Sequence, residues 1–147
     1  MRGLLALVCV MAMSCSDVRA QQANVTWEVG ALAGRFNGMS LKAYPESETP
    51  ERSIDIQFSV NGRDFIALRA HVLTETRLPN SPLTLYLGPG ATLGTNDSEL
   101  FLGPAAEIGV FFGIAQYRVF LQAMPQLHIT PRLEGSILAA VGFRLSI

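Results

Sequence analysis

Apolar and polar residues alternate one by one along most of the chain after residue 20. The pattern is clearest from Ile54 to Val60, where isoleucine, phenylalanine and valine occupy the even positions and polar residues the odd ones. A period of two residues predicts β-strands with one apolar face. We expect eight such strands, at residues 25–34, 38–44, 54–60, 65–74, 83–93, 100–112, 117–129 and 136–147.

The connections between these segments are short and contain turn-forming residues. Asn61 and Gly62 form a pair typical of a tight β-hairpin, and residues 45–51, 77–82 and 94–98 are polar loops. Eight consecutive strands joined by short turns predict an all-β fold, an eight-stranded antiparallel up-and-down β-barrel in which each strand pairs with the next one along the chain.

The first twenty residues predict a cleaved signal peptide, which leaves residues 21–147 as the β-barrel domain. A basic residue near the start, an apolar run at residues 4–13 and the small residue Ala20 match the parts of an export signal. One alternative is a retained anchor helix, although the run is shorter than the ~20 residues that a membrane span needs. Another is lipidation at Cys15.

The polar face of the predicted strands indicates the interior of the barrel. It carries charges of both signs and many of the strand glycines, such as Gly30, Gly88 and Gly142. Small residues and balanced charges suit the narrow interior of an eight-stranded barrel, whereas glycine only weakens a strand that faces solvent. The predicted lumen polar network comprises Glu28, Lys42, Asp55, Arg69, His71, Glu107, Gln122, His128 and Arg144. The predicted lipid-facing residues are Trp27, Ile56, Phe58, Leu121 and Phe143.

Charges inside a barrel must be paired, because an unpaired buried charge destabilises the fold. We therefore expect the three acidic side chains of the network to be compensated by its three basic ones, in an arrangement that plugs the lumen. For Arg144 we expect Glu107 as the partner, because the strands that carry them flank the same strand. Aromatic residues near strand ends, Trp27 above all, are candidates for an interfacial girdle.

Some features fit a membrane barrel less well. The second and third predicted strands are about seven residues long, below the ~9–11 expected for a membrane-spanning strand. Pro89, Pro104 and Pro125 fall within predicted strands, where proline removes a hydrogen bond between neighbours. We therefore expect a bulge or a poorly paired position at each proline.

Composition and motifs exclude several kinds of chemistry. The net charge of −1 and the lack of a basic stripe give no reason to expect nucleic acid as a partner. Both cysteines, Cys9 and Cys15, lie in the predicted signal peptide, so the mature chain has no disulfide. His71 and His128 form only a weak metal pattern, and we expect neither a metal nor another cofactor.

Three functions remain open. We favour a structural or interaction barrel in the outer membrane, monomeric, surrounded by outer-membrane lipid and placed there by the export and barrel-insertion machinery. The first alternative is a soluble periplasmic or extracellular barrel that binds a lipid or another apolar ligand. The remote alternative is an outer-membrane lipid-modifying enzyme, in which His128, Thr130 and Glu134 would resemble the groups of a lipid-A deacylase barrel. We otherwise find no catalytic motif and predict that the protein is not an enzyme.

Four stretches of the chain carry a resemblance to a known family. They are residues 38–42 (GMSLK), 83–90 (LTLYLGPG), 120–125 (FLQAMP) with Thr130-Pro131, and 139–144 (AAVGFR). In these stretches, and more loosely from residue 25 to 147, the chain resembles small bacterial outer-membrane β-barrel proteins, most of them without an assigned activity. The resemblance implies an outer-membrane location and supplies no catalytic residues.

Overall fold

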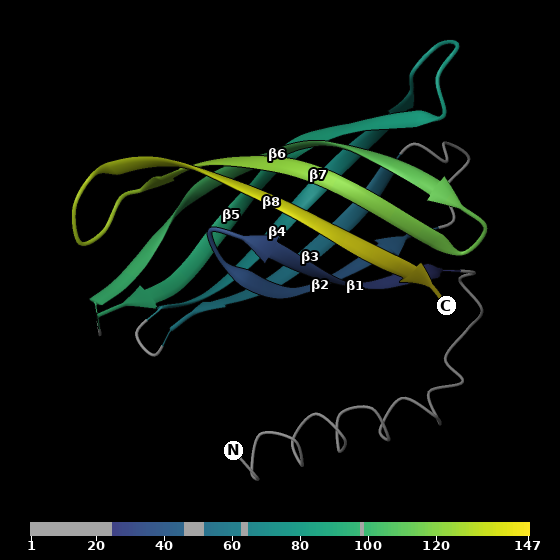
Figure 1. The fold of residues 1–147 in the computed structure, drawn as a ribbon. Helices are drawn as coiled ribbons and strands as arrows, with labels where there is room; N and C mark the ends of the chain where they lie inside the picture. Colours follow the sequence, from purple (N-terminus) through teal and green to yellow (C-terminus); the bar gives the residue numbers. More distant parts are fainter. Residues whose placement is uncertain (1–24, 46–51, 63–64, 98) are drawn as a thin grey trace, which may run out of the picture.

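The computed structural model describes residues 25–45, 52–62, 65–97 and 99–147, and the alternating segments there form eight strands (Figure 1). Each strand pairs with the next in an antiparallel manner, and the last pairs with the first, so the sheet closes into a barrel. This confirms the predicted fold. The strands are β1 (Thr26–Gly34), β2 (Asn37–Tyr44), β3 (Arg52–Asn61), β4 (Phe65–Arg77), β5 (Leu83–Asn96), β6 (Glu99–Ile114), β7 (Tyr117–His128) and β8 (Glu134–Ser146).

The barrel has two rims, which we call the C-terminal rim and the mouth rim. The C-terminal rim is the one at which β8 ends, and the turns at residues 78–82 and 115–116 lie on it. The mouth rim is the opposite one, with the turns at residues 35–36 and 129–133 (Figure 1). Within the described residues, no helix is long and apolar enough to cross a membrane. The predicted signal peptide, residues 1–20, lies outside the described residues.

Several strands are longer than their alternation predicted. β3 begins at Arg52, β4 continues to Arg77 and β5 to Asn96, because polar residues at the strand ends keep their backbone pairing although they interrupt the apolar pattern. β3 therefore has 10 residues and β2 has 8, where about seven were expected.

The three mid-strand prolines lie where the pairing is irregular, as expected. Pro89 falls in a gap of the β4–β5 ladder, and Pro125 falls in a gap of the β6–β7 ladder. Pro104 lies between the Leu102–Thr130 bridge and the Ala105–Gln126 pair, whose registers differ by one residue. Proline has no N–H to donate, so a carbonyl paired with it would lose its hydrogen bond. Because the prolines lie in gaps of the pairing, no carbonyl loses a bond to them there.

Side chains alternate between the interior and the outside, and the interior carries the polar set. Charged residues such as Glu28, Lys42 and Asp55 are fully buried, whereas large apolar residues such as Leu121 (58% exposed) lie on the outer surface. This distribution is the reverse of that in a water-soluble barrel, where apolar residues fill the centre.

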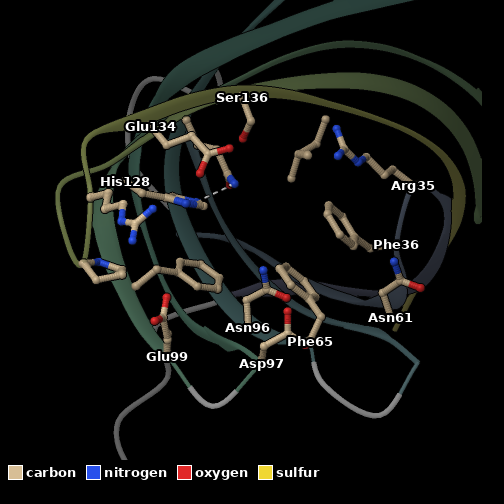
Figure 2. Close-up of a pocket in the computed structure, with 15 residues that line it drawn as sticks. Arg35, Phe36, Asn61, Phe65, Asn96, Asp97, Glu99, His128, Glu134 and Ser136 are labelled. Carbon is tan, nitrogen blue, oxygen red and sulfur yellow. Dashed lines mark hydrogen bonds between the residues drawn. The ribbon is translucent and has the colours of Figure 1, made fainter.

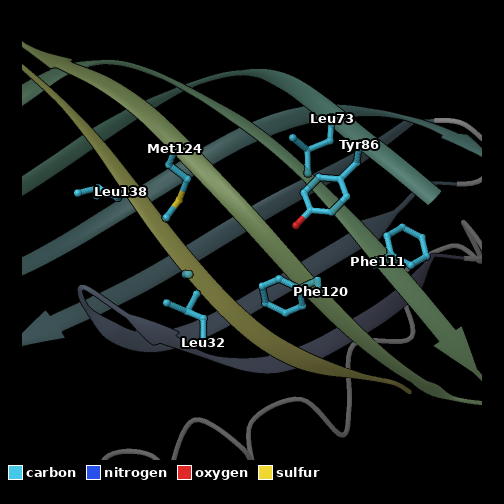
Figure 3. Packing of buried hydrophobic residues seen from close by; sticks show 8 residues of the cluster. Leu32, Leu73, Tyr86, Phe111, Phe120, Met124 and Leu138 are labelled. Atoms are coloured by element: carbon cyan, nitrogen blue, oxygen red, sulfur yellow. The ribbon is translucent and has the colours of Figure 1, made fainter. Parts of the chain in front are cut away.

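An apolar cluster also lies inside the barrel (Figure 3). It arises where alternation is broken and two apolar residues are adjacent, as at Phe111-Phe112 or Ile137-Leu138. One of each such pair must point inward. The cluster contains Leu32, Leu73, Tyr86, Phe111, Phe120, Met124, Leu138 and Ala140.

Glycines on the inner face make room for the largest interior side chains. At each of five positions a large side chain lies directly against the glycine that is paired with it on the neighbouring strand, so a methyl group on that glycine would overlap it. The five pairs are Tyr86–Gly109, Phe120–Gly142, His71–Gly90, Phe101–Gly94 and Arg144–Gly30. The glycine content of the polar face is therefore a packing requirement.

Gly142→Ala should destabilise the barrel by ~1–3 kcal/mol, because the new methyl group would overlap the Phe120 ring and a strand carbonyl. The control is Gly113→Ala, where the nearest atom to a new methyl group, Cγ of Arg118, is 3.7 Å away. We expect no loss in the control. The measurement is denaturant-induced unfolding in detergent micelles, followed by Trp27 fluorescence. Equal free energies of unfolding for the two variants would contradict the packing argument.

Candidate functional site: a charged interior and a pocket at one mouth

Near the C-terminal rim, an ion-pair group joins four strands across the interior. The Arg118 guanidinium of β7 lies 2.8 Å from the Glu28 carboxylate of β1 and donates to the Tyr44 hydroxyl at 2.6 Å. That hydroxyl donates to Glu75 of β4 (3.1 Å), and Glu75 also pairs with Lys42 of β2 at 2.5 Å. The group thus connects β1, β2, β4 and β7.

A second group lies deeper in the barrel, around Arg144 of β8. Its guanidinium lies 2.5 Å from the Asp55 carboxylate of β3 and donates through Nε to the Ser40 hydroxyl (2.9 Å). The Ser40 hydroxyl in turn donates to Asp55 (2.7 Å), so the three side chains form a closed triangle. Charge-assisted hydrogen bonds of this kind are stronger than those between neutral groups.

A third group is built on Glu107 of β6. Its carboxylate lies 2.9 Å from Nδ1 of His71 and accepts a hydrogen bond from the Gln57 amide (3.0 Å). The carbonyl of Gln57 accepts from Gln122 (3.1 Å), whose own carbonyl accepts from the Tyr86 hydroxyl (3.1 Å). All five side chains are buried.

The expected pairing of Arg144 with Glu107 is wrong: Arg144 pairs with Asp55, and Glu107 pairs with His71. Arg69 also differs from the expectation, because it lies within 4.0 Å of no carboxylate among the described residues. Its guanidinium donates instead to the Ser59 hydroxyl (2.9 Å) and the Gln126 carbonyl (3.3 Å). Arg144 of β8 thus reaches across the lumen to Asp55 on β3, three strands away, rather than to Glu107 on β6, two strands away.

Two charged members of the network were missed, Glu75 and Arg118. Both follow the same alternation as predicted neighbours: Glu75 continues the inward series of Arg69 and His71, and Arg118 precedes Gln122 by four residues on β7. Continuing each period to the end of its strand would have found them.

The cations are also held by aromatic rings, an interaction that adds to the ion pairs where water is excluded. Each of the four basic side chains that the described strands direct into the barrel lies over at least one ring. The distances from the cationic group to the ring centroid are 4.7 Å for Lys42–Tyr86, 4.8 Å for Arg118–Phe111, 3.9 Å for Arg144–Phe120 and 5.5 Å for Arg69–Phe36.

A cavity of about 780 Å³ opens at the mouth rim (Figure 2). Its walls carry amide, carboxylate, guanidinium and hydroxyl groups, among them Asn61, Asn96, Glu99 and Ser136. Cavities of this size bind small ligands in other proteins, and barrel mouths are one of their usual places. The pattern of residues in the sequence did not predict this cavity.

Aromatic rings line one part of the mouth cavity as a continuous stack. Phe36 stacks on Phe65 with 4.3 Å between ring centroids, Phe65 on Phe101 at 5.6 Å, and Phe101 on His128 at 4.4 Å. His128, predicted for the lumen network, thus lies at the mouth, half-buried, and its Nε2 accepts from the Gln126 amide at 2.8 Å (Figure 2). The signal in the sequence was the presence of two phenylalanines, Phe65 and Phe101, at positions of the strands' polar face.

The other predicted residues occupy the expected faces, and the chemistry considered for the histidines is not assembled. Trp27, Ile56, Phe58, Leu121 and Phe143 all lie exposed on the outer surface. In the described part of the chain, no side-chain hydrogen bond joins His128 to Thr130 or Glu134, and no three His, Cys, Asp or Glu residues are grouped to hold a metal ion.

Known structures share this architecture, although no protein-family model and no curated protein matches the sequence. The N-terminal β-barrel domain of Pseudomonas aeruginosa OprF matches with a TM-score of 0.64 and 12% identity, over 86% of this chain and 98% of that one. Neisserial surface protein A matches with a TM-score of 0.56 and 11% identity, over 82% and 93%. The outer membrane protein Ail of Yersinia pestis has a TM-score of 0.48. The chain has the fold of small eight-stranded outer-membrane β-barrels.

Arg144→Met should lower the free energy of unfolding by ~3–5 kcal/mol, because it leaves the buried Asp55 carboxylate without its cation. The double variant Arg144→Met/Asp55→Leu should recover part of the loss. Arg118→Met, at a pair whose cation is 28% exposed, should cost less. Urea-induced unfolding in lipid vesicles measures these three variants and the single variant Asp55→Leu. If the double variant is as unstable as the sum of its single changes, the two residues are not coupled.

Proposed function

We propose that the mature chain is an integral barrel of the bacterial outer membrane with a structural or interaction role, and that its interior network plugs the lumen. The observation that supports this most directly is the distribution of side chains. Charged groups are buried and apolar groups are exposed along the described strands, which is the arrangement that a membrane barrel requires and a water-soluble one avoids.

The outer surface supports the same proposal. Apolar side chains cover every strand, and a tight pair of aromatic rings, Tyr117 and Phe143 with 6.2 Å between centroids, lies toward the C-terminal rim. Trp27 is on the outer surface near the same rim, where Ile147 N–H donates to its carbonyl. Aromatic residues at this level serve as interfacial anchors in membrane barrels.

The soluble alternative, a barrel that binds an apolar ligand, would need an apolar interior. Among the described residues, the interior of this barrel contains four carboxylates and four basic side chains instead: Glu28, Asp55, Glu75, Glu107, Lys42, Arg69, Arg118 and Arg144. The three ion pairs among these described residues join strands that are not neighbours, so they bridge the lumen and leave it filled.

Leu121→Arg should reduce the folding free energy in lipid vesicles by ~2–4 kcal/mol, because Leu121 is an outward residue within β7 and would place a charge in lipid. Leu133→Arg is the matched control: the same change at an exposed residue in the turn on the mouth rim should cost ~0–1 kcal/mol. Equal, small effects at both positions would support a barrel in water and overturn the proposal.

A plugged lumen should conduct few ions. The purified protein in planar bilayers should therefore show no steady single-channel current under conditions in which a larger water-filled porin conducts. Insertion is checked separately by protease protection of the same samples. Large, stable currents from inserted protein would contradict the plug and indicate a pore.

A further inference from the structure

β8 extends beyond the strand that closes the barrel against it. β1 pairs with β8 only as far as Gly34, which lies opposite Ala140, and the last backbone link is from Arg35 N–H to the Ala139 carbonyl at 3.4 Å. Toward the mouth rim, residues 134–138 pair with β7 on one side and with none of the described residues on the other. Figure 1 shows the β1–β2 turn ending well short of the β7–β8 loop.

The backbone groups on this free edge belong to Gly135 and Ile137. In an antiparallel sheet, successive residues direct their N–H and C=O groups to opposite neighbours. Since the Ala139 carbonyl faces β1, the groups of Ile137 and Gly135 face the same side, where β1 has ended. Ser136 and Leu138 direct theirs to β7. Each of the two edge residues thus presents one donor and one acceptor.

The free edge is also a wall of the mouth cavity. The side chains of Ser136 and Leu138 line the cavity, together with Arg35 and Phe36 at the adjacent turn (Figure 2). Ile137 points outward and is 70% exposed. An extended segment laid along the edge would therefore place alternate side chains in the cavity and the others over Ile137.

We propose that this edge and cavity bind an extended peptide segment of a partner protein by strand addition to β8. Main-chain hydrogen bonds to Gly135 and Ile137 would hold the segment, and the cavity would select its inward side chains. A small polar ligand would fit the cavity but would leave the edge groups without protein partners, so the peptide accounts for both features.

Arg35 indicates the charge of the segment. Its guanidinium points into the mouth beside the edge (Figure 2), and it makes no salt bridge with any described residue. Arginine pairs with carboxylates through two parallel hydrogen bonds. We therefore expect a glutamate or aspartate among the inward side chains of the bound segment.

A second copy of this chain does not fit the edge. This step rests on the proposed membrane location: two copies inserted in the same direction are related by an axis along the membrane normal. Strands tilted ~35–45° from that normal then cross at ~70–90°, which prevents pairing of the two β8 edges. The partner is accordingly another polypeptide.

The test is amide exchange of the folded protein in detergent micelles, followed by NMR. Without a peptide, the amides of Gly135 and Ile137 should exchange fast and those of Ser136 and Leu138 slowly. The probe is a synthetic hexapeptide of alternating valine and threonine with one central glutamate, added up to about 1 mM. It should slow exchange at Gly135 and Ile137, whereas the same peptide with N-methylated backbone should not. Slow exchange before addition, or no change after it, overturns the proposal.

Two pairs of variants separate edge pairing from side-chain contact. Ile137→Pro removes the edge N–H without touching the ladder to β7 and should weaken peptide binding at least about tenfold, whereas Ile137→Ala should have a smaller effect. Arg35→Gln should weaken binding of the glutamate peptide but not of its glutamine analogue. Equal effects of the two Ile137 variants, or no selectivity at Arg35, would contradict the respective step. These binding experiments use micelles and not a membrane. A negative result would therefore overturn the peptide proposal without bearing on the proposed outer-membrane location.

Discussion

The narrow interior of a closed eight-stranded barrel is the constraint on which the rest of this structure depends. Eight strands leave a centre that side chains just fill, so every inward residue must fit against those opposite and beside it. Large side chains meet this requirement by lying on paired glycines, as Phe120 does on Gly142. Charged side chains meet it by reaching across the lumen to a partner of opposite sign.

The ion pairs follow from the same geometry. Lys42–Glu75, Arg118–Glu28 and Arg144–Asp55 each join strands that are separated by at least one other strand, and so does the contact between the His71 ring and Glu107. Such pairs tie non-adjacent strands together, and the aromatic rings beneath the cations exclude water that would otherwise weaken them. Because polar residues fill the interior and pair with one another there, the apolar residues of each strand face outward. An apolar outer surface is what connects this fold with a membrane.

The alternation of residues was enough to predict the number, order and facing of the strands, because it is a local property that each strand carries in its own sequence. The partners in the network could not be predicted in this way. Arg144 reaches Asp55 rather than Glu107 because the stagger of the closed sheet sets which inward residues lie at the same depth, and that stagger is a property of the whole barrel. The mouth cavity was missed for a related reason: Phe36 of the β1–β2 turn, Phe65 of β4 and Phe101 of β6 are far apart in the sequence and meet only in the folded barrel.

Fractionation of cells that produce the full chain tests the central claim, that the apolar outer surface is buried in a membrane, most directly. The account predicts recovery in the outer-membrane fraction, release only by detergent, and faster migration of the unheated protein than of the boiled protein on a gel. Recovery in the soluble periplasmic fraction without detergent would contradict it.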